Sequence, residues 1–478
     1  MKQDIAETLK RIDTRDWKQI SLEYGPDRLE VAVPGDSFEV SMGKVPSIDD
    51  WRIELDRAFS NPIGSPKLEE IIRAKGKSPG EISVAIAVSD ITRPVPYKGE
   101  QGVLGPILQK LASEGIKKEN TKIIVATGMH RSSSYKEKVE MYGGEIVDRY
   151  QILDHDCENT DLLVSIGKTM RGTDVYVNRD FYLSDLKIAT GLVESHFMTG
   201  ISGGRKSICP GLVDVKTIQR FHGPQYLEDQ NATNLILEGN PCHEEALEVA
   251  KTVGVDFIVN VTLDKEMRVT RVFTGDLVKA HMEAYKMITE CAAIPLDRQF
   301  DIVLTHGGYV GRDHYQTAKA GVGALPAVAG GGIIIIAANN RDREPIGSSE
   351  YKTLLHLSKI QGPDGYLEFL KNPHWRFTKD QWEPEVWGKV IRKVGNDGLI
   401  YCSNEIAKED YLIIPGTSGH EFLPDGTVYR SDLEKVQAMV QNALIHSVFR
   451  LKRKNREPSV CYIREGPYAI PIFRNSSQ

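Results

Sequence analysis

Short apolar runs alternate with helical patterns along most of this chain, and this alternation restricts its fold more than any other feature. The runs are four to seven residues long and bounded by turn residues, as is typical of strands buried on both faces. The predicted strands are residues 82–88, 122–126, 186–192, 257–261, 302–305, 333–338 and 411–414. Helical patterns cover residues 103–112, 244–253 and 276–293. The order predicts an α/β fold with mostly parallel sheets, in which ligands bind beyond the carboxyl ends of the strands.

A chain of 478 residues is long enough for two or three domains. A long helical pattern ends near residue 293, a proline follows, and a new strand begins at Asp301. We therefore expect an N-terminal α/β domain over residues 1–295 and a C-terminal α/β domain over residues 296–440, with the active site in the interdomain cleft. The final segment, residues 441–478, contains two strand-like runs, and we expect it to pack back on the N-terminal domain.

Charge and cysteine spacing exclude several classes of protein. The 60 Lys and Arg residues are outnumbered by 66 Asp and Glu, which argues against a nucleic-acid partner. The six cysteines are widely scattered without a C-x-x-C pair, so a disulfide framework or a cysteine zinc site is not expected. The first residues lack a signal-peptide core, and the longest apolar run, residues 333–338, is too short to span a bilayer. We expect a soluble, cytoplasmic protein with no membrane partner.

Polar residues follow the predicted strands in several places. Residues 89–96 contain Asp90, Thr92 and Arg93, which suit an anion-holding loop or, alternatively, a helix N-cap with a surface arginine. His130 follows a glycine turn after the next strand, where it is either a general base or an ordinary surface residue. Asp154, His155, Asp156 and Cys157 lie too close together to bind one ion easily, which favours a structural role.

The most informative stretch is residues 194–211. Glycines surround Ser202 and Lys206, which predicts backbone held close to a ligand with the amine aimed at it. The stretch nearly matches the phosphate-binding pattern G-x-x-x-x-G-K-[ST] from Gly200, but Arg205 occupies the second glycine position. Lys206 is therefore interpreted as a covalent attachment point or an anion contact. His222 follows at a helix end, where a C-cap role is the alternative.

A further polar cluster, in the second half of the chain, follows the strand that begins at Asp301. Tyr315 and Lys319 are four residues apart and share one helix face, with Gln316 three residues before Lys319. The cluster suits a carboxylate ligand, and the alternative is a solvated helix face. Established catalytic signatures are missing, because the sequence has no H-E-x-x-H or G-x-S-x-G, and Pro326 breaks a dinucleotide-binding glycine pattern.

Taken together, these stretches resemble the nickel-dependent lactate racemase family, which carries a nickel-pincer nucleotide. The resemblance runs from about residue 89 to residue 382 and depends on the order of its motifs. They are Asp-x-Thr-Arg-Pro, Ala-Thr-Gly-x-His-Arg, the histidine ahead of Ser-Gly-Gly-x-Lys, the downstream histidine, and Tyr-Gln-x-x-Lys.

The resemblance implies roles for individual residues. Lys206 resembles the lysine bonded covalently to the cofactor, His222 the nickel ligand, and His130 and His196 the two acid/base groups, one for each face of the substrate. It implies cofactor contacts from Asp90, Thr92, Ser202, Gly203 and Gly204, and substrate contacts from Arg93, Thr199, Tyr315, Gln316, Lys319 and Trp382. The implied reaction inverts C2 of a 2-hydroxycarboxylate by hydride transfer, and separate biosynthetic proteins supply the cofactor.

Two departures from the family pattern leave the substrate open. Thr199 stands where a serine is expected. Arg312 adds a positive charge before Tyr315. This charge suits a larger or more anionic substrate, such as a dicarboxylate or a sugar acid, and the alternative is that the Arg312 side chain points to solvent. Two other functions are carried forward as alternatives: a phosphate-handling nucleotide-binding enzyme built on residues 200–207, and a non-catalytic sensor of a small acid. The joint presence of His130, His196, Lys206 and His222 argues against the sensor.

Overall fold

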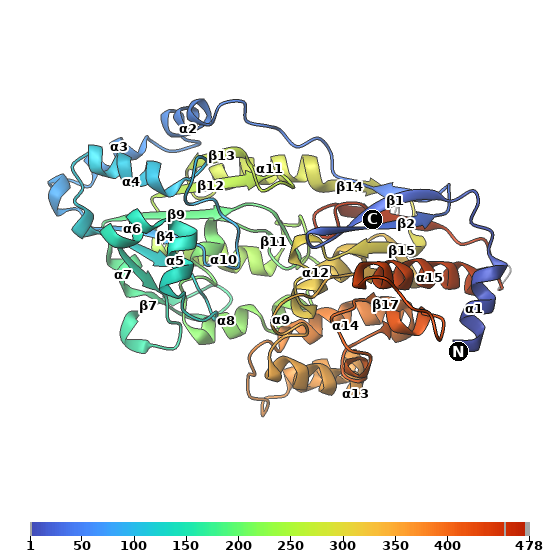
Figure 1. Cartoon of the computed structure of the whole chain (residues 1–478). Helices are drawn as coiled ribbons and strands as arrows, with labels where there is room; N and C mark the ends of the chain where they lie inside the picture. Colours follow the sequence, from blue (N-terminus) through green and yellow to red (C-terminus); the bar gives the residue numbers. More distant parts are fainter. Residues whose placement is uncertain (1, 454–455, 474–478) are drawn as a thin grey trace. The chain divides into compact units, whose positions relative to one another are not determined.

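The structure, a computed structural model, describes residues 2–453 and 456–473. The chain forms two compact units, and each is described by itself (Figure 1). One unit is Lys44–Cys291, and the other combines Met1–Gly43 with Ala292–Gln478. Both units contain a six-stranded, mostly parallel sheet with helices, so the predicted α/β class is confirmed.

The sheet of the Lys44–Cys291 unit has the strand order β13-β12-β9-β4-β5-β6. All neighbouring strands are parallel except the edge pair β12 and β13. The strands are β4 (Val84–Val88), β5 (Thr121–Val125), β6 (Gln151–Asp154), β9 (Leu186–Leu192), β12 (Phe257–Leu263) and β13 (Val269–Gly275). Every residue of β4 is buried, as expected for a strand covered on both faces.

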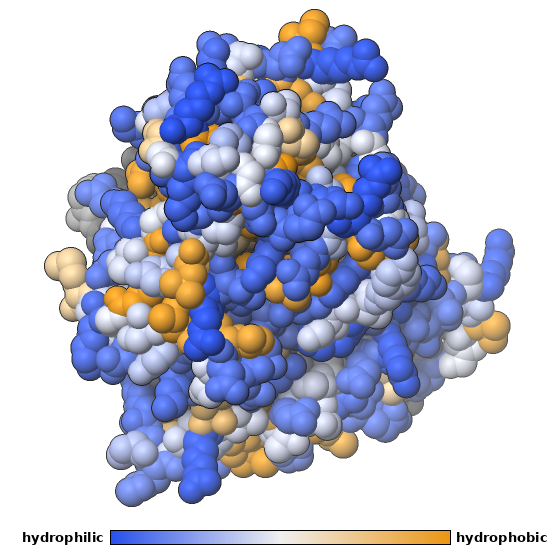
Figure 2. All heavy atoms as spheres, turned by 90° about the vertical axis from the view of Figure 1, so that its left-hand side faces the viewer, coloured by the Kyte–Doolittle hydropathy of each residue, from blue (hydrophilic) through white to orange (hydrophobic). Residues whose placement is uncertain are grey.

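Helices and two small hairpins complete this unit. The helices are α2 (Trp51–Ser60), α3 (Leu68–Ala74), α4 (Leu104–Ser113), α5 (Tyr135–Tyr142), α6 (Gly144–Arg149), α7 (Arg179–Leu183), α8 (Val215–Phe221), α9 (Pro224–Leu227), α10 (Pro241–Val253) and α11 (Lys279–Ala292). The hairpins pair β7 (Leu163–Lys168) with β8 (Asp174–Asn178) and β10 (Ser195–His196) with β11 (Gly200–Ile201). The face of the molecule in Figure 2 is mainly hydrophilic, with small separate apolar patches, because most large apolar side chains are buried in the core.

The second unit contains a fully parallel sheet with the order β18-β17-β16-β15-β19-β3. Its strands are β3 (Phe38–Val40), β15 (Phe300–His306), β16 (Val328–Ala337), β17 (Leu399–Cys402), β18 (Thr417–Ser418) and β19 (Val460–Ile463). The pairs β1 (Lys18–Tyr24) with β2 (Asp27–Val33) and β14 (Ala293–Leu296) with β20 (Ile470–Phe473) lie outside this sheet. The helices are α1 (Lys2–Arg11), α12 (His314–Ala324), α13 (Ser349–Lys371), α14 (Trp382–Val394) and α15 (Asp432–Lys452).

The division of the chain differs from the predicted domains at both ends. Residues 1–43 and 441–478 belong with the C-terminal α/β unit, and not with the unit that follows residue 43. The cause is long-range pairing, since β3 adds to the sheet beside β19 and Gln441 on α15 exchanges two hydrogen bonds with the backbone of Ala32. The boundary expected near residue 295 lies close to the observed break between residues 291 and 292.

One predicted strand is wrong. Residues 411–414 lie at the end of a short 3-10 helix, Lys408–Leu412, and beyond it. The carbonyls of Tyr411 and Ile414 accept hydrogen bonds from the amine of Lys359, so no strand ladder uses them in this stretch. No helix in the described part of the chain combines the length and the apolarity that crossing a membrane requires.

Candidate active site

Two loops of the Lys44–Cys291 unit bring Asp90 and His130 together. They follow β4 and β5, which are adjacent and parallel, so both loops leave the same edge of the sheet. Nδ1 of His130 lies 2.5 Å from Oδ2 of Asp90, and Thr92 donates to Oδ1 of Asp90 from its amide and its hydroxyl. The carboxylate therefore favours a proton on Nδ1, and the lone pair of a neutral His130 lies on Nε2.

The environment of Asp90 keeps its carboxyl charged. Burial raises its pKa, but the hydrogen bond and charge of His130 and the two hydrogen bonds from Thr92 outweigh burial, so the pKa is lowered overall. Asp90 is 5% exposed, whereas more than half of the His130 side chain is accessible. An anchored carboxylate behind an accessible imidazole is an arrangement suited to proton transfer.

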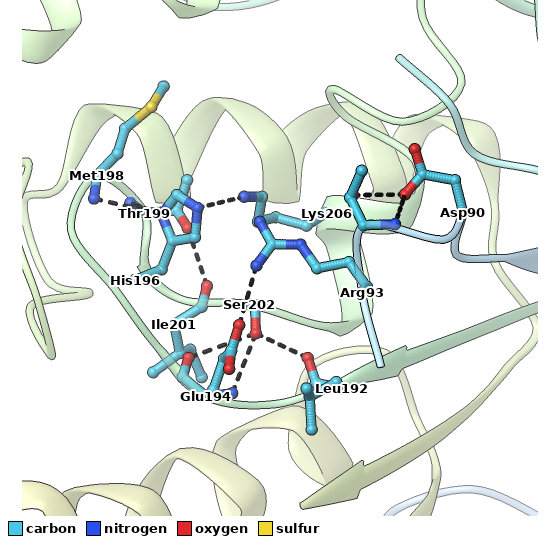
Figure 3. Close-up of polar contacts among 11 residues, drawn as sticks. Asp90, Arg93, Leu192, Glu194, His196, Met198, Thr199, Ile201, Ser202 and Lys206 are labelled. Carbon is cyan, nitrogen blue, oxygen red and sulfur yellow. Dashed lines mark hydrogen bonds and ion pairs between the residues drawn. The ribbon is translucent and has the colours of Figure 1, made fainter. Parts of the chain in front are cut away.

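The glycine loop, defined here as residues 199–207, brings Lys206 to His196. Nζ of Lys206 lies 2.7 Å from Nε2 of His196. Figure 3 marks this contact with a dashed line. Nδ1 of His196 accepts hydrogen bonds from the backbone amides of Met198 and Thr199, both at 3.3 Å. These two amides hold the ring with Nδ1 as an acceptor and Nε2 toward the lysine.

Other predicted residues of the glycine loop determine the conformation of its backbone. Gly203 and Gly204 have φ angles of 75° and 51°, and a Cβ on Gly204 would lie 2.9 Å from the ring of His281. The Ser202 hydroxyl donates to the carbonyl of Leu192, and the buried Thr199 hydroxyl donates to that of Ile201 (Figure 3). The contacts that the resemblance implies for these residues therefore stay predictions.

His222 lies at the C-cap of α8 and is neutral near physiological pH. Burial, with a smaller contribution from the charges of Lys206 and His130, lowers the pKa of His222 to about 4, although its hydrogen bond to the carbonyl of Ile218 acts in the opposite direction. Its Nδ1 lies 2.9 Å from the carbonyl oxygen of Ile218, which places the proton on Nδ1 and the lone pair on Nε2. The C-cap role is therefore present, through the hydrogen bond to Ile218, while the neutral ring, with its lone pair on Nε2, is the form of histidine that binds metals.

Arg93 pairs with Glu194, to which the sequence analysis assigned no role. Nη1 of Arg93 lies 2.9 Å from Oε1 of Glu194, and both side chains are about one quarter exposed. The pair is drawn in Figure 3. The two residues are separated by 101 positions, so no local pattern links them. The only usable signal was the position of Glu194, two residues before His196, in the loop after β9.

The remaining predicted residues lie in the other unit. Trp382 at the start of α14 donates from Nε1 to the hydroxyl of Tyr315 on α12, at 2.7 Å. The Gln316 amide is capped by Asp313, and the charge of Lys319 acts on the buried carboxyl of Glu383, whose pKa burial raises strongly. Tyr315, Lys319 and Trp382 are thus gathered where α12 meets α14. Arg312 is 60% exposed and lies 3.7 Å from Asp342, which favours the solvent-facing alternative for this residue.

We expect the Trp382–Tyr315 hydrogen bond to stabilise the α12–α14 contact measurably. Trp382→Phe and Tyr315→Phe should each lower the free energy of unfolding by about 1–3 kcal/mol, because each removes one partner of a largely buried bond. Chemical denaturation of the two single variants and the double variant should give a coupling energy of about 0.5–3 kcal/mol. Additive effects of the two substitutions would show that the bond contributes nothing.

The polar stretch at residues 154–157 contains buried side chains, among them His155 and Cys157. His155 is 2% exposed, its Nε2 lies 2.9 Å from the carbonyl of Val213, and burial lowers its pKa. Burial raises the pKa of the Cys157 thiol to about 11. Within residues 2–453 and 456–473, no group of three or more His, Cys, Asp and Glu side chains is arranged to hold a metal ion.

The Lys44–Cys291 unit is an α/β unit that presents imidazole, amine and guanidinium groups in loops at its strand ends, where α/β proteins bind ligands. The lactate racemase N-terminal domain family matches residues 24–234. A lactate racemase of Lactiplantibacillus plantarum is 32% identical over 339 residues, 70% of this chain and 77% of that protein. A lactate racemase of Thermoanaerobacterium thermosaccharolyticum is 31% identical over 378 residues, 78% of this chain and 85% of that protein.

Solved structures agree with these sequence matches. The lactate racemase apoprotein from Thermoanaerobacterium thermosaccharolyticum superposes with a TM-score of 0.79 and 26% identity, covering 96% of this chain and all of that chain. A crystal structure of a Thermotoga maritima protein, at 18% identity and a TM-score of 0.59 over 87% of this chain and all of that chain, shares the fold. The chain belongs to the lactate racemase family and is an isomerase, so the predicted family is confirmed.

Proposed function

We propose that this chain inverts the C2 centre of a 2-hydroxycarboxylate, lactate or a larger hydroxy acid, with a nickel-pincer nucleotide attached to Lys206. The observation that carries the proposal is the constellation of Lys206, His196, His130 and His222. Lys206 contacts His196 directly, and the charges of Lys206 and His130 act on His222. Membership in the lactate racemase family favours this function over a phosphate-handling enzyme or a sensor.

The residues present fit the proposed cofactor. A nickel ion with soft sulfur ligands accepts a neutral imidazole, and His222 is kept neutral with its lone pair on Nε2. The hydrogen bond from Nδ1 to the carbonyl of Ile218 is the kind of outer contact that orients a metal-binding histidine. The amine of Lys206 extends from the glycine loop, whose left-handed glycines keep side chains away from the backbone there.

The reaction needs help because the α-hydrogen of a 2-hydroxycarboxylate is barely acidic beside a carboxylate that already carries negative charge. When bound, the nickel-pincer nucleotide supplies a hydride acceptor, which avoids a carbanion. His130 takes the hydroxyl proton at Nε2 while Asp90 stabilises the ring through Nδ1. When the hydroxyl group forms again on the inverted product, His196 gives the proton from the opposite face, and the two histidines exchange these roles in the reverse direction. Arg93, held by Glu194, binds the substrate carboxylate.

The α12–α14 residues complete the proposed set of substrate contacts. Tyr315, Gln316, Lys319 and Trp382 are proposed to contact the substrate, with the cationic Lys319 favouring an acid. Separate biosynthetic proteins are proposed to supply the cofactor, and the cytoplasm is the proposed location. The hydroxyl of Thr199 donates to the carbonyl of Ile201.

A chiral assay tests this function. The chain is produced together with the cofactor-building proteins and incubated with single enantiomers of lactate, larger monocarboxylic hydroxy acids, hydroxy dicarboxylates and sugar acids. The proposal predicts that one of these acids approaches a racemic or epimeric mixture, starting from either configuration. Retention of configuration by every acid, in a preparation shown to hold the cofactor, would contradict the proposal.

The low pKa of His222 gives a separate prediction for the chain without cofactor. In the folded chain the ring should take up its proton near pH 4, whereas an unfolded histidine titrates near 6.5. Acidification from about pH 6.5 to pH 4 should therefore destabilise the fold, because only the unfolded state gains this proton. An NMR titration, with His222→Gln used to assign the resonance, measures the value. A midpoint near 6.5 would show that burial does not keep the ring neutral.

A further inference from the structure

Arg205, which breaks the phosphate-loop pattern, is directed into the protein and not toward a ligand. Its side chain is fully buried, and Nη2 donates to the carbonyls of Thr199 (2.9 Å) and Ile201 (3.1 Å). Nη1 lies 2.8 Å from Nε2 of His281 on α11. The guanidinium therefore connects the start of the glycine loop, through the carbonyls of Thr199 and Ile201, to His281 on α11.

The surroundings of Arg205 make a positive charge there unfavourable for the stability of the fold. Within the described residues no carboxylate forms an ion pair with Arg205, and its Nε has no hydrogen-bond partner. Burial lowers the pKa of Arg205 to about 9 and, together with the charge of Arg205, keeps the pKa of His281 well below its usual range. A buried cation held only by carbonyls and a neutral ring costs stability, so the fold alone does not account for it.

The carbonyls that Arg205 holds belong to the segment that holds His196. The amide of Thr199 donates to Nδ1 of His196, and the carbonyl of the same residue accepts from Arg205. The other ring nitrogen of His196 faces Lys206, the residue next to Arg205 in the chain. Arg205 is thus linked to both residues of the His196–Lys206 contact. It reaches His196 through Thr199, and it is joined to Lys206 directly as its neighbour in the chain.

A guanidinium suits this task better than an ammonium. The planar guanidinium has several donors and contacts two carbonyls, two residues apart, together with a ring on another helix. An ammonium is a compact point charge on a flexible stem. Asn240 adds to the same support, since its side-chain amide donates to the carbonyl of Met198 at 3.0 Å. Asn240 thus holds the peptide whose amide donates from Thr199 to His196, and Arg205 holds the next peptide of the chain through the carbonyl of Thr199. Both side chains are buried.

We propose that Arg205 is a positioning residue that fixes His196 with Nδ1 as acceptor and Nε2 toward Lys206, so that its loss impairs turnover more than substrate binding. The proposed consequence for turnover rests on the acid/base role proposed for His196. The orientation and tautomer of the ring do not depend on that role, because they are set by the glycine loop in the chain without cofactor.

The first experiment is nitrogen NMR of the cofactor-free chain with ¹⁵N-labelled histidine, with His196→Gln used to assign the His196 signals. In its neutral form the wild-type ring should show the separate nitrogen signals of one tautomer. Arg205→Lys should give a folded protein in which His196 shows the averaged signals of a ring with mixed tautomers. Thr274→Val is the matched control, because it removes another buried hydrogen bond of the same unit, to the carbonyl of Ala58, and should leave His196 unchanged.

The second readout is kinetic and uses the chain loaded with cofactor. Arg205→Lys should lower kcat by about 10²-fold, with KM changed by less than about 3-fold, because a small misplacement of a catalytic group affects the reaction more than binding. His281→Gln keeps the guanidinium but removes the ring beside it. It should change the NMR signals of His196 and kcat in the same direction as Arg205→Lys, to a smaller extent. If Arg205→Lys does not fold, His281→Gln provides the test.

The two readouts separate the possible failures. A folded Arg205→Lys or His281→Gln protein with the wild-type tautomer of His196 would overturn the positioning role. An altered tautomer with unchanged kcat would also overturn the proposed consequence for turnover, and would point to a fault in the role assigned to His196. An altered tautomer with reduced kcat and a preserved KM supports both.

Discussion

Lys206→Ala is expected to abolish attachment of the cofactor and to lower racemisation by more than about 10⁴-fold. The cofactor carries the difficult step, and acid–base help from side chains alone is worth only about 10²–10⁴-fold. The structure supports this expectation because the Lys206 amine contacts His196 and its charge acts on His222. Intact and peptide mass spectrometry of the chain produced with the cofactor-building proteins should show an adduct on the peptide containing Lys206, and none in the variant.

Two comparison variants make this result specific. Lys206→Arg keeps a positive charge but has no amine able to form an amide-type bond, so it should also carry no adduct. Lys251→Ala removes an exposed lysine on α10 in the same unit and should carry the wild-type adduct. An adduct of unchanged mass on the Lys206→Ala protein, or full activity in that variant, would contradict covalent attachment at this position.

His130→Ala and His196→Ala should each retain the cofactor yet lose about 10²–10⁴-fold in turnover. The two rings are held differently: His130 by the carboxylate of Asp90, and His196 by the amides of Met198 and Thr199. Neither substitution removes Lys206 or His222, so the adduct mass should stay. Initial rates with each enantiomer, measured beside adduct quantification, separate loss of chemistry from loss of cofactor.

His155→Ala is an informative contrast to these two variants. His155 is a buried histidine of the same unit that contacts Asn178 and the carbonyl of Val213, so its loss should reduce stability. The folded fraction of His155→Ala should nevertheless turn over at a rate close to the wild type. Full turnover in either His130→Ala or His196→Ala would remove that histidine from the acid/base pair.

The sequence predicted those parts of the fold that depend on local patterns. The run at residues 186–192 is β9 without a shift, and the polar residues after the strands do lie in loops at strand ends. Residues 18–24 form β1, and their alternating apolar side chains are the local pattern of such a strand. Residues 411–414 have the composition of a strand but lack one, because Lys359 takes their carbonyls.

The parts that could not be predicted depend on contacts between distant residues. Glu194 meets Arg93 across 101 positions, and Arg205 meets His281 across 76. Residues 1–43 join the C-terminal sheet because β3 pairs with β19, which no local pattern encodes. Candidate residues could therefore be named from motif order, whereas the groups that orient them required the folded chain.

The most direct test of the central claim follows the hydrogen on C2. A single enantiomer of the accepted hydroxy acid, deuterated at C2, is incubated in ordinary water with the loaded chain, and the inverted product is analysed by chiral separation and mass spectrometry. Hydride transfer predicts that the inverted product keeps its deuterium, because a transferred hydride does not exchange with water. Inversion with loss of the label to solvent would show that C2 loses a proton instead, and would contradict the account.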